Sequence, residues 1–391
     1  MNHLEIHNFG PLADVDVEFG DLTFFVGPQA SGKSLALESL KLIQDRDSVI
    51  DTLDRYNYII GHNARKILNV YYGEGMDGLW KDDSILKLDD RELTCGNLSC
   101  DSSGAEPSVF YVPAQRIVCM GDGFPKFFSD FSFTTPYVLR EFTETLRAFV
   151  QFGLGDRKRI FPIEDEFGGL QSKVFDTSIF NSGEVELTEV SGQKKMLLSV
   201  EGMKIPFMAW STGQKEFMPL LLAFYCLSGS PANIVRRGHY SAVIIEEPEM
   251  GLHPKAIVGV LLQIIGMMVE FGYKVVISTH SSVFLEFAWA FNVLKGHTRH
   301  FHEALCDMFE VSIDSPAGRI LGKMEDRIIK TYYFSRNANG KVETTDISSL
   351  DVDSEELSLS EWGGLAEFAS RMNDMVSKYL EYSSGQAVGP S

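Results

Sequence analysis

The sequence predicts an α/β fold with a mixed central sheet flanked by helices, and three observations support this. Short, strongly apolar runs typical of buried strands occur at Leu22–Val26, Ala242–Ile245 and Lys274–Ile277. The first run leads into a glycine-rich octapeptide, and the helix pattern Leu35–Ile43 follows it. The other two runs end in carboxylate or hydroxyl side chains, as strands do at the ligand edge of a parallel sheet.

The octapeptide GPQASGKS matches the phosphate-binding pattern G-x-x-x-x-G-K-[ST] in full. In such a loop, backbone N–H groups and the following helix dipole converge on a phosphate. We expect Lys33 to bridge the outer phosphates and Ser34 to ligate Mg²⁺. An ordinary glycine-rich turn is the alternative, but the flanking strand and helix favour the phosphate site. The nucleotide-binding residues expected here are Gly27, Pro28, Gln29, Ala30, Ser31, Gly32, Lys33 and Ser34.

Composition limits the function classes. The 391 residues are 44% hydrophobic, enough for a substantial core, and 35 basic against 54 acidic side chains give a net charge of −19. A generally basic surface for nucleic acid is therefore excluded, although a local basic groove is not. The five cysteines form no CxxC pair, so we expect reduced thiols in a cytoplasmic protein.

No membrane segment is expected. The longest apolar runs, Phe217–Leu227 and Ile257–Val269, are shorter than the roughly 20 residues that span a bilayer. We also identify no signal peptide. Both runs are predicted to be buried helices.

The N-terminal half contains a further series of predicted elements. A hairpin, Leu4–Ile6 and Val15–Phe19, precedes the phosphate loop. The region 45–104 is predicted to form short helices and an edge hairpin. A strand at Ser108–Val112 and a helix at Tyr137–Phe152 follow, without the heptad repeats of a long coiled coil.

Two polar residues follow the strand at 108–112. Gln115 and Arg116 lie in the sequence PAQR, just past the strand end, where ligands bind in a parallel sheet. A simple polar loop pair explains them equally well. Both interpretations remain open from the sequence.

A β-rich region leads to the second motif, Ser211–Glu216. Its short alternating runs predict four strands, at Lys173–Asp176, Glu184–Thr188, Lys195–Val200 and Lys204–Met208. Ser211 and Gly213 then stand at the start of an apolar helix, where hydroxyl and N–H groups bind anions. A plain capping box, with Gln214 or Glu216 reaching back, is the alternative.

The third motif, EEPE, closes the apolar run at 242–245. Adjacent carboxylates repel, so the pair Glu246 and Glu247 at a strand tip favours a metal site. Glu246 would hold Mg²⁺, and Glu247 would orient and deprotonate the attacking water. Glu249 is either a third ligand or a surface charge, and we favour a surface charge.

The fourth motif places His280 at the tip of the strand that begins at Lys274. A histidine there can donate a hydrogen bond to a γ-phosphate oxygen or to the ordered water. A lone histidine is usually structural. His280 follows the next predicted strand after the one that ends in the carboxylates, and this position favours the functional role.

Together the motifs GPQASGKS, STGQKE, VIIEEPEMGLHP and ISTHS resemble the ABC-type ATPase head, in its soluble RecF/SMC-like branch, which includes OLD-family and related prokaryotic defence ATPases. The resemblance covers residues 1–20, the phosphate loop and 208–282, and 45–207 only in outline. It implies a P-loop NTPase fold of ABC type, with an antiparallel β subdomain and a helical insertion. It also implies hydrolysis of ATP to ADP and phosphate with Mg²⁺ as cofactor.

The resemblance also implies residue roles. Glu246, in place of the commoner aspartate, would bind the metal, Glu247 would be the general base and His280 the γ-phosphate switch. Gln115 would be the lid glutamine, although PAQR departs from the usual pattern. The signature motif implied for the second nucleotide contact comprises Ser211, Gly213 and Gln214. In this family the signature reaches the nucleotide of a second head, which implies an ATP-sandwich dimer or a higher oligomer.

The domain organisation follows from the same motifs. We expect a head at 1–292 with an insertion at about 45–207, an extension at 293–382 that completes it, and a disordered tail at 383–391. The extension is predicted to contain two strands, an acidic turn region at 346–356 and an amphipathic helix, with bounds Ile328–Ser335, Lys341–Thr345 and Glu361–Tyr379 for the strands and helix. The block Asp351–Glu356 either binds a cation or, as we favour, forms a solvated loop.

Three functions compete at this point. The leading hypothesis is an ATPase that dimerises around ATP and regulates a separate nuclease or toxin in prokaryotic antiphage defence. The alternative is a RecF-like repair or chromosome-maintenance ATPase that binds DNA directly. A transporter subunit is disfavoured by the N-terminal hairpin and the EEPE motif.

Overall fold

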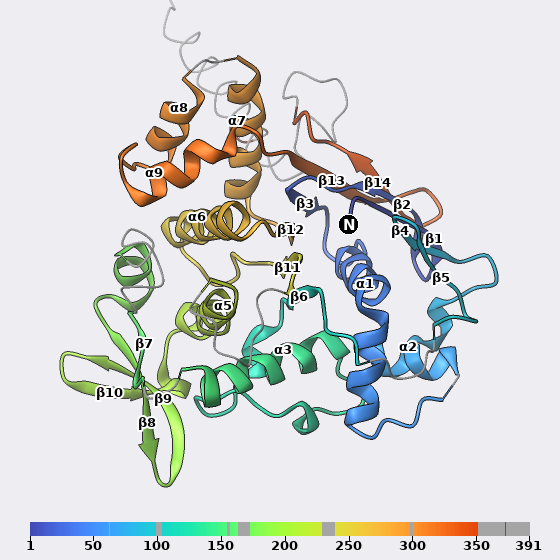
Figure 1. Cartoon of the computed structure of the whole chain (residues 1–391), viewed down its shortest axis with the longest axis horizontal. Helices are drawn as coiled ribbons and strands as arrows, with labels where there is room; N and C mark the ends of the chain where they lie inside the picture. The colour runs from blue at the N-terminus through green and yellow to red at the C-terminus, as the bar shows by residue number, and fades with distance from the viewer. Residues whose placement is uncertain are drawn as a thin grey trace, which may run out of the picture.

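The computed structural model describes residues 1–61, 63–98, 104–154, 157–162, 173–228, 239–297, 300–350 and 372. These residues form a ten-stranded mixed sheet with helices on both faces and a separate four-stranded antiparallel sheet (Figure 1). The predicted fold class is confirmed.

The large sheet has the order β5-β4-β1-β2-β14-β13-β3-β12-β11-β6. Its strands are β1 His3–Phe9, β2 Leu12–Glu18, β3 Leu22–Val26, β4 Ile85–Leu88, β5 Arg91–Leu93, β6 Val109–Val112, β11 Ala242–Glu246, β12 Lys274–Ser278, β13 Ile329–Arg336 and β14 Val342–Asp346. The strands β13, β3, β12, β11 and β6 run parallel to one another. The predicted edge hairpin is confirmed, because β4 and β5 extend the sheet beyond β1.

The parallel strands are buried on both faces, which explains their continuous apolar sequences. Successive residues alternate between two cores. Val243 and Ile245 face the core formed with α5, α6 and α7, whereas Ile244 faces the core formed with α1 and α2. The strand tips and the phosphate loop are therefore held between two helical layers.

The helices are α1 Lys33–Arg55, α2 Ala64–Tyr72, α3 Tyr137–Ala148, α5 Thr212–Ser228, α6 Pro254–Phe271, α7 Ser282–His297, α8 Phe301–Met308 and α9 Pro316–Leu321. By length and composition α6 could cross a membrane, but 72% of it is buried inside the fold. It contacts α5, α7 and α9, so it is a core helix as predicted.

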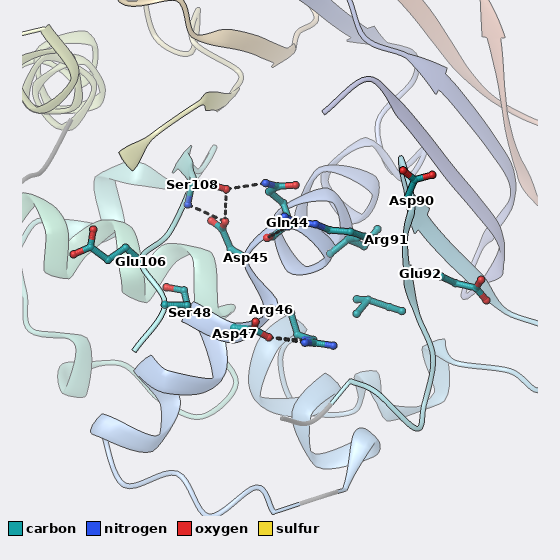
Figure 2. Close-up of a pocket in the computed structure, with 13 residues that line it drawn as sticks. Gln44, Asp45, Arg46, Asp47, Ser48, Asp90, Arg91, Glu92, Glu106 and Ser108 are labelled. Carbon is teal, nitrogen blue, oxygen red and sulfur yellow. Dashed lines mark hydrogen bonds and ion pairs between the residues drawn. The ribbon is translucent and has the colours of Figure 1, made fainter. Parts of the chain in front are cut away.

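Helix α1 is longer than the predicted Leu35–Ile43, and it is kinked at Asp45 (φ −115°, ψ 22°). The Asp45 carboxylate accepts hydrogen bonds from Ser108 N at 2.8 Å and Ser108 Oγ at 2.7 Å (Figure 2). It also accepts one from Val109 N at 3.0 Å. Beside these residues lies a cavity of about 660 Å³, lined mostly by polar side chains and by none of the phosphate-loop residues. The kink attaches α1 to the start of β6.

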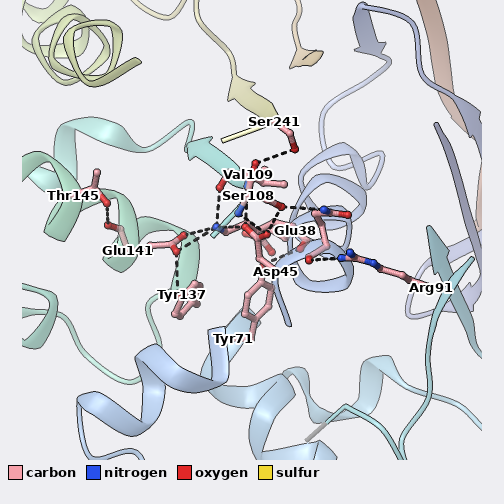
Figure 3. Close-up of polar contacts among 12 residues, drawn as sticks. Glu38, Asp45, Tyr71, Arg91, Ser108, Val109, Tyr137, Glu141, Thr145 and Ser241 are labelled. Atoms are coloured by element: carbon pink, nitrogen blue, oxygen red, sulfur yellow. Dashed lines mark hydrogen bonds and ion pairs between the residues drawn. The ribbon is translucent and has the colours of Figure 1, made fainter. Parts of the chain in front are cut away.

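A buried ionic cluster reinforces this attachment (Figure 3). Lys41 Nζ contacts Asp45 at 2.8 Å, Glu141 at 3.0 Å and the Val109 carbonyl at 2.8 Å. Burial opposes the ammonium charge, but the two carboxylates outweigh it and raise the pKa of Lys41. The cluster joins α1 and α3 to the first residue of β6.

The small sheet has the order β10-β9-β8-β7, with strands β7 Arg159–Phe161, β8 Glu184–Val190, β9 Gln193–Val200 and β10 Met203–Pro206. Three of the four predicted strands are confirmed. The prediction of a strand at Lys173–Asp176 is wrong, because this segment is helical and continues to Phe180. Phe175 and Phe180 pack against Phe217 of α5, and this packing outweighs local strand preference.

The predicted strands of the extension are confirmed as β13 and β14. Among the described residues, four cysteines are free thiols. Three predictions lie outside the described residues: the acidic block from Asp351 to Glu356, the helix Glu361–Tyr379 and the tail 383–391.

Candidate nucleotide-binding site

The phosphate loop connects β3 to α1, as predicted, and its backbone takes conformations that favour glycine. Gly27 and Gly32 have φ values of 141° and 84°. A Cβ on Gly27 would lie 2.3 Å from the Phe334 carbonyl oxygen, and one on Gly32 would lie 2.6 Å from Leu12 Cδ2. The loop is therefore enclosed by β13 and the β1–β2 hairpin, and both positions require glycine.

Lys33 is buried, with 6% of its surface exposed, and its ammonium lies across the loop. Its Nζ donates to the Gly27 carbonyl at 2.8 Å and to the Pro28 carbonyl at 3.0 Å, and it lies 3.3 Å from His280 Nε2. Burial lowers the pKa of Lys33, although Glu247 and Glu246 oppose this. A phosphate entering the loop would give this ammonium a charged partner.

Ser34 and Glu246 meet at the start of α1. The Ser34 hydroxyl donates to Glu246 Oε2 at 2.7 Å, and the Tyr111 hydroxyl donates to Oε1. Glu246 is only 5% exposed at the end of β11. Burial raises the pKa of Glu246, while the hydrogen bonds from Tyr111 and Ser34 oppose the rise. The structure thus brings the two predicted metal ligands together.

Glu247 follows directly, with an unusual positive φ of 43°. Its Oε1 lies 3.4 Å from His280 Nε2, so the proposed base and the proposed phosphate sensor face each other. Burial and the neighbouring Glu249 raise the pKa of Glu247 to about 8.

Glu249 is not the surface charge that we favoured. Its Oε1 accepts hydrogen bonds from Thr279 Oγ1 at 2.6 Å and from the His280 N–H at 2.7 Å. The half-buried carboxylate therefore ties the loop after β11 to the loop after β12. It fixes His280 relative to Glu247.

The signature residues form a capping box within their own chain. The Ser211 N–H donates to Gln214 Oε1 at 3.0 Å, and the Gln214 N–H donates to Ser211 Oγ at 3.3 Å. A Cβ on Gly213 would lie 2.6 Å from the Gly251 carbonyl oxygen, so α5 starts against the loop that follows β11. The capping box does not exclude a further anion contact, because Ser211 remains exposed.

The two polar residues after β6 differ in their environment. Gln115 is exposed at the turn. Arg116 is fully buried and donates to the backbone carbonyls of Glu246 and Glu247. The sequence left two interpretations open for Arg116, a ligand contact and a simple polar loop. Its buried contacts with backbone carbonyls fit neither.

Sequence reasoning missed two further residues. Tyr111 reaches Glu246 because β6 and β11 are parallel neighbours, and the aromatic residue near the end of the predicted strand 108–112 was the available signal. Arg336, at the end of β13, donates to the Ala30 carbonyl of the phosphate loop at 2.6 Å. No local pattern indicates this contact, because the two residues are 306 positions apart.

The donor set fits a hard cation held partly by a nucleotide. Within the described residues, no group of three or more His, Cys, Asp or Glu side chains could hold a metal ion. One hydroxyl and one carboxylate, from Ser34 and Glu246, are typical of Mg²⁺ sites completed by phosphates and water. These two residues would hold the ion.

Two family models match the sequence. One, described as AAA ATPase domain, matches residues 1–103, and the other, described as AAA domain, putative AbiEii toxin, Type IV TA system, matches residues 151–286. The first match contains the phosphate loop, and the second contains the signature, carboxylate and histidine motifs in the order found at the site. Both descriptions name an AAA domain, and the two matches together contain all the motifs that meet at the site.

Solved structures similar to this chain include three SMC heads. An SMC head bound to the C-winged helix domain of ScpA is 12% identical, covers 88% of this chain and 96% of its own, and has a TM-score of 0.43. The SMC head domain from Thermotoga maritima is 11% identical over 88% and 98%, with a TM-score of 0.39. An SMC head with an extended coiled coil, bound to the C-terminal domain of ScpA derived from Pyrococcus furiosus, is 11% identical over 88% and 95%, with a TM-score of 0.37. No curated protein matches the sequence.

Proposed function

We propose that the protein binds ATP with Mg²⁺ at the phosphate loop and hydrolyses it to ADP and phosphate. One observation carries the proposal. Five polar side chains from three separate segments meet within hydrogen-bonding or ion-pair contact: Lys33, Ser34, Glu246, Glu247 and His280. A structural cluster would not need a lysine, a histidine and two carboxylates beside a glycine-rich loop.

The residues have distinct roles in the proposal. Lys33 exchanges its carbonyl partners for phosphate oxygens, and Ser34 and Glu246 hold Mg²⁺. The ion supplies charge neutralisation on the phosphates. Glu247 accepts the proton of the attacking water, and His280, 3.4 Å away, donates to the γ-phosphate or the water.

The proposal includes a second copy of the chain. Ser211 is exposed at the N-terminus of the 17-residue helix α5, where free N–H groups and the dipole favour an anion. Its hydroxyl caps its own helix and keeps lone-pair and donor capacity for a phosphate. The signature of one chain would contact the nucleotide of the other, and ATP would close the dimer or a higher oligomer. Gln115 would link the metal site to the helical insertion.

The output of the dimer is proposed to be the control of a separate nuclease or toxin in antiphage defence, in the cytoplasm. Support comes from the matched model whose description names a putative toxin of a Type IV TA system. The net charge of −19 gives this role more support than direct, RecF-like DNA binding. Salt-dependent binding of the purified protein to DNA would favour the alternative.

Steady-state hydrolysis tests the proposal. The purified protein should release phosphate from ATP with Mg²⁺, and EDTA should abolish the release. Lys33→Ala should lose both nucleotide binding and turnover, whereas Lys66→Ala, an exposed lysine on α2, should keep them. Equal turnover in the parent and Lys33→Ala would contradict the assignment.

A further inference from the structure

Arg116 connects two parts of the proposed site through backbone contacts. Its Nε donates to the Glu216 carbonyl in the first turns of α5 at 3.0 Å. Its Nη1 and Nη2 each donate to the Glu247 carbonyl at 3.1 Å, and Nη1 also reaches the Glu246 carbonyl at 3.1 Å. One fully buried guanidinium therefore spans from the signature helix to the residue proposed as the base.

Arg116 contacts the backbone of Glu247, which has an uncommon conformation. Glu247 has a φ of 43°, in a region that residues with a Cβ rarely adopt unless the surrounding structure holds them there. The backbone of Glu247 is held on both sides. Two guanidinium donors bind its carbonyl, and its N–H donates to the Ser278 carbonyl at 2.9 Å. The position of the Glu247 carboxylate therefore depends on where Arg116 lies.

Arg116 in turn depends on α5. The Glu216 side chain is 7% exposed, and its Oε2 is buried without a hydrogen-bond partner in the described part of the chain. Gly213, one turn earlier, packs against the Gly251 carbonyl oxygen with no room for a Cβ. A small movement of the first turns of α5 would therefore act on Arg116 and on the loop after β11 together.

We propose that Arg116 is a positioning residue that transmits the placement of the signature helix to Glu247, so that the second copy of the chain controls hydrolysis through it. The inference rests on the proposed function, because it takes Glu247 as the base and α5 as the part that meets the second copy. The hydrogen bonds of Arg116 described above all go to backbone carbonyls of the protein. Arg116 fixes the backbone that carries the base.

A conservative variant tests the proposal. Arg116→Lys keeps the charge but cannot reach both Glu216 and Glu247, so kcat should fall about a hundredfold, as expected for a misplaced catalytic group. Binding of a fluorescent ATP analogue should stay within about twofold, because the loop contacts of Lys33 are untouched. The effect should therefore appear in kcat and not in nucleotide affinity.

Arg140→Lys is the matched control. Arg140 is another fully buried arginine, on α3, held by Tyr58 and the Val70 carbonyl and not by the site. Arg140→Lys should lower the melting temperature as much as Arg116→Lys does, and it should leave kcat of the folded protein unchanged. Normal kcat in folded Arg116→Lys, or equal kcat losses in both variants, would overturn the inference.

Hydrogen exchange of the unmodified protein provides a test that needs no Arg116 variant. Addition of a slowly hydrolysed ATP analogue with Mg²⁺ should change exchange in 212–217 and in 247–252 together. A change in the first segment alone would contradict the coupling. If the parent neither binds nor hydrolyses ATP, the proposed function fails and the inference with it; if the parent hydrolyses ATP and Arg116→Lys matches it, only the inference fails.

Discussion

The Ser34 hydroxyl donates a hydrogen bond to Oε2 of Glu246 at 2.7 Å, across 212 positions of sequence. This contact joins the first turn of α1 to the tip of β11, the two places where nucleotide-binding folds of this type hold a cation. It is the structural reason for proposing that both residues hold one Mg²⁺ ion.

Removal of this hydroxyl should impair hydrolysis. Ser34→Ala should lower kcat/KM for ATP about 10- to 100-fold, because a hydrogen bond or ligand to a charged group contributes about 1.5–3 kcal/mol. Titration of Mg²⁺ should show a weaker apparent affinity for the ion. Ser39→Ala, five residues further along α1 and bonded to Tyr72, is the control and should keep the parent Mg²⁺ dependence. Identical Mg²⁺ titrations for the parent and Ser34→Ala would exclude Ser34 as a ligand.

The contact between Arg336 and the phosphate loop predicts an effect on affinity. Arg336→Ala frees the Ala30 carbonyl, so the loop should lose part of its preorganisation and the Kd for ATP should rise about tenfold. Arg319→Ala removes a similar exposed contact, to the Asp314 carbonyl, far from the loop in sequence, and should leave the Kd unchanged. Calorimetric titration with ATP would distinguish the two, and equal affinities would show that the Arg336 contact is incidental.

The proposed composite site predicts complementation between two impaired variants. Ser211→Arg should bind nucleotide and lose cooperative hydrolysis. Lys33→Ala should lose its own phosphate site but keep an intact signature motif. In a mixture, each dimer that pairs the two variants holds one intact composite site, so part of the parent activity should return. A mixture that stays inactive although the two variants associate with each other in the presence of ATP would argue against the signature acting between chains.

The buried cluster around Lys41 predicts a loss of stability without a change in chemistry. Lys41→Met should lower the free energy of unfolding by about 3–5 kcal/mol, because it leaves Asp45 and Glu141 buried without their cation. Lys66→Met, at an exposed position of α2, should stay within about 0.5 kcal/mol of the parent. Denaturant titration measures both, and a change under about 1 kcal/mol for Lys41→Met would show that the cluster adds little.

The parallel strands and the phosphate loop could be predicted from sequence because each depends on local pattern. Strands buried on both faces give continuous apolar runs, and the loop needs glycine where φ is positive. The prediction of a strand at Lys173–Asp176 failed because packing of Phe175 on Phe217 determines that segment. Helix α1 was predicted too short because the polar residues after Ile43 look like a helix end, yet Asp45 is satisfied by Ser108 and Val109.

Contacts between distant segments account for the rest of the site. Glu249 looked like a surface charge because its partners, Thr279 and the His280 N–H, lie 30 and 31 positions away. The role of Arg116 stayed open in the sequence because its acceptors are backbone carbonyls, which no residue pattern reveals. Motif order predicted which residues meet, and the three-dimensional structure was needed to show what holds them.

The central claim is that ATP closes a dimer and that Glu247 opens it by hydrolysis. Glu247→Gln should bind ATP, turn over orders of magnitude more slowly than the parent, and accumulate as a dimer with ATP and Mg²⁺ but not with ADP. Analytical ultracentrifugation of this variant with each nucleotide, beside its phosphate-release rate, is the most direct measurement. A monomer under all conditions together with parent-like turnover would contradict the account.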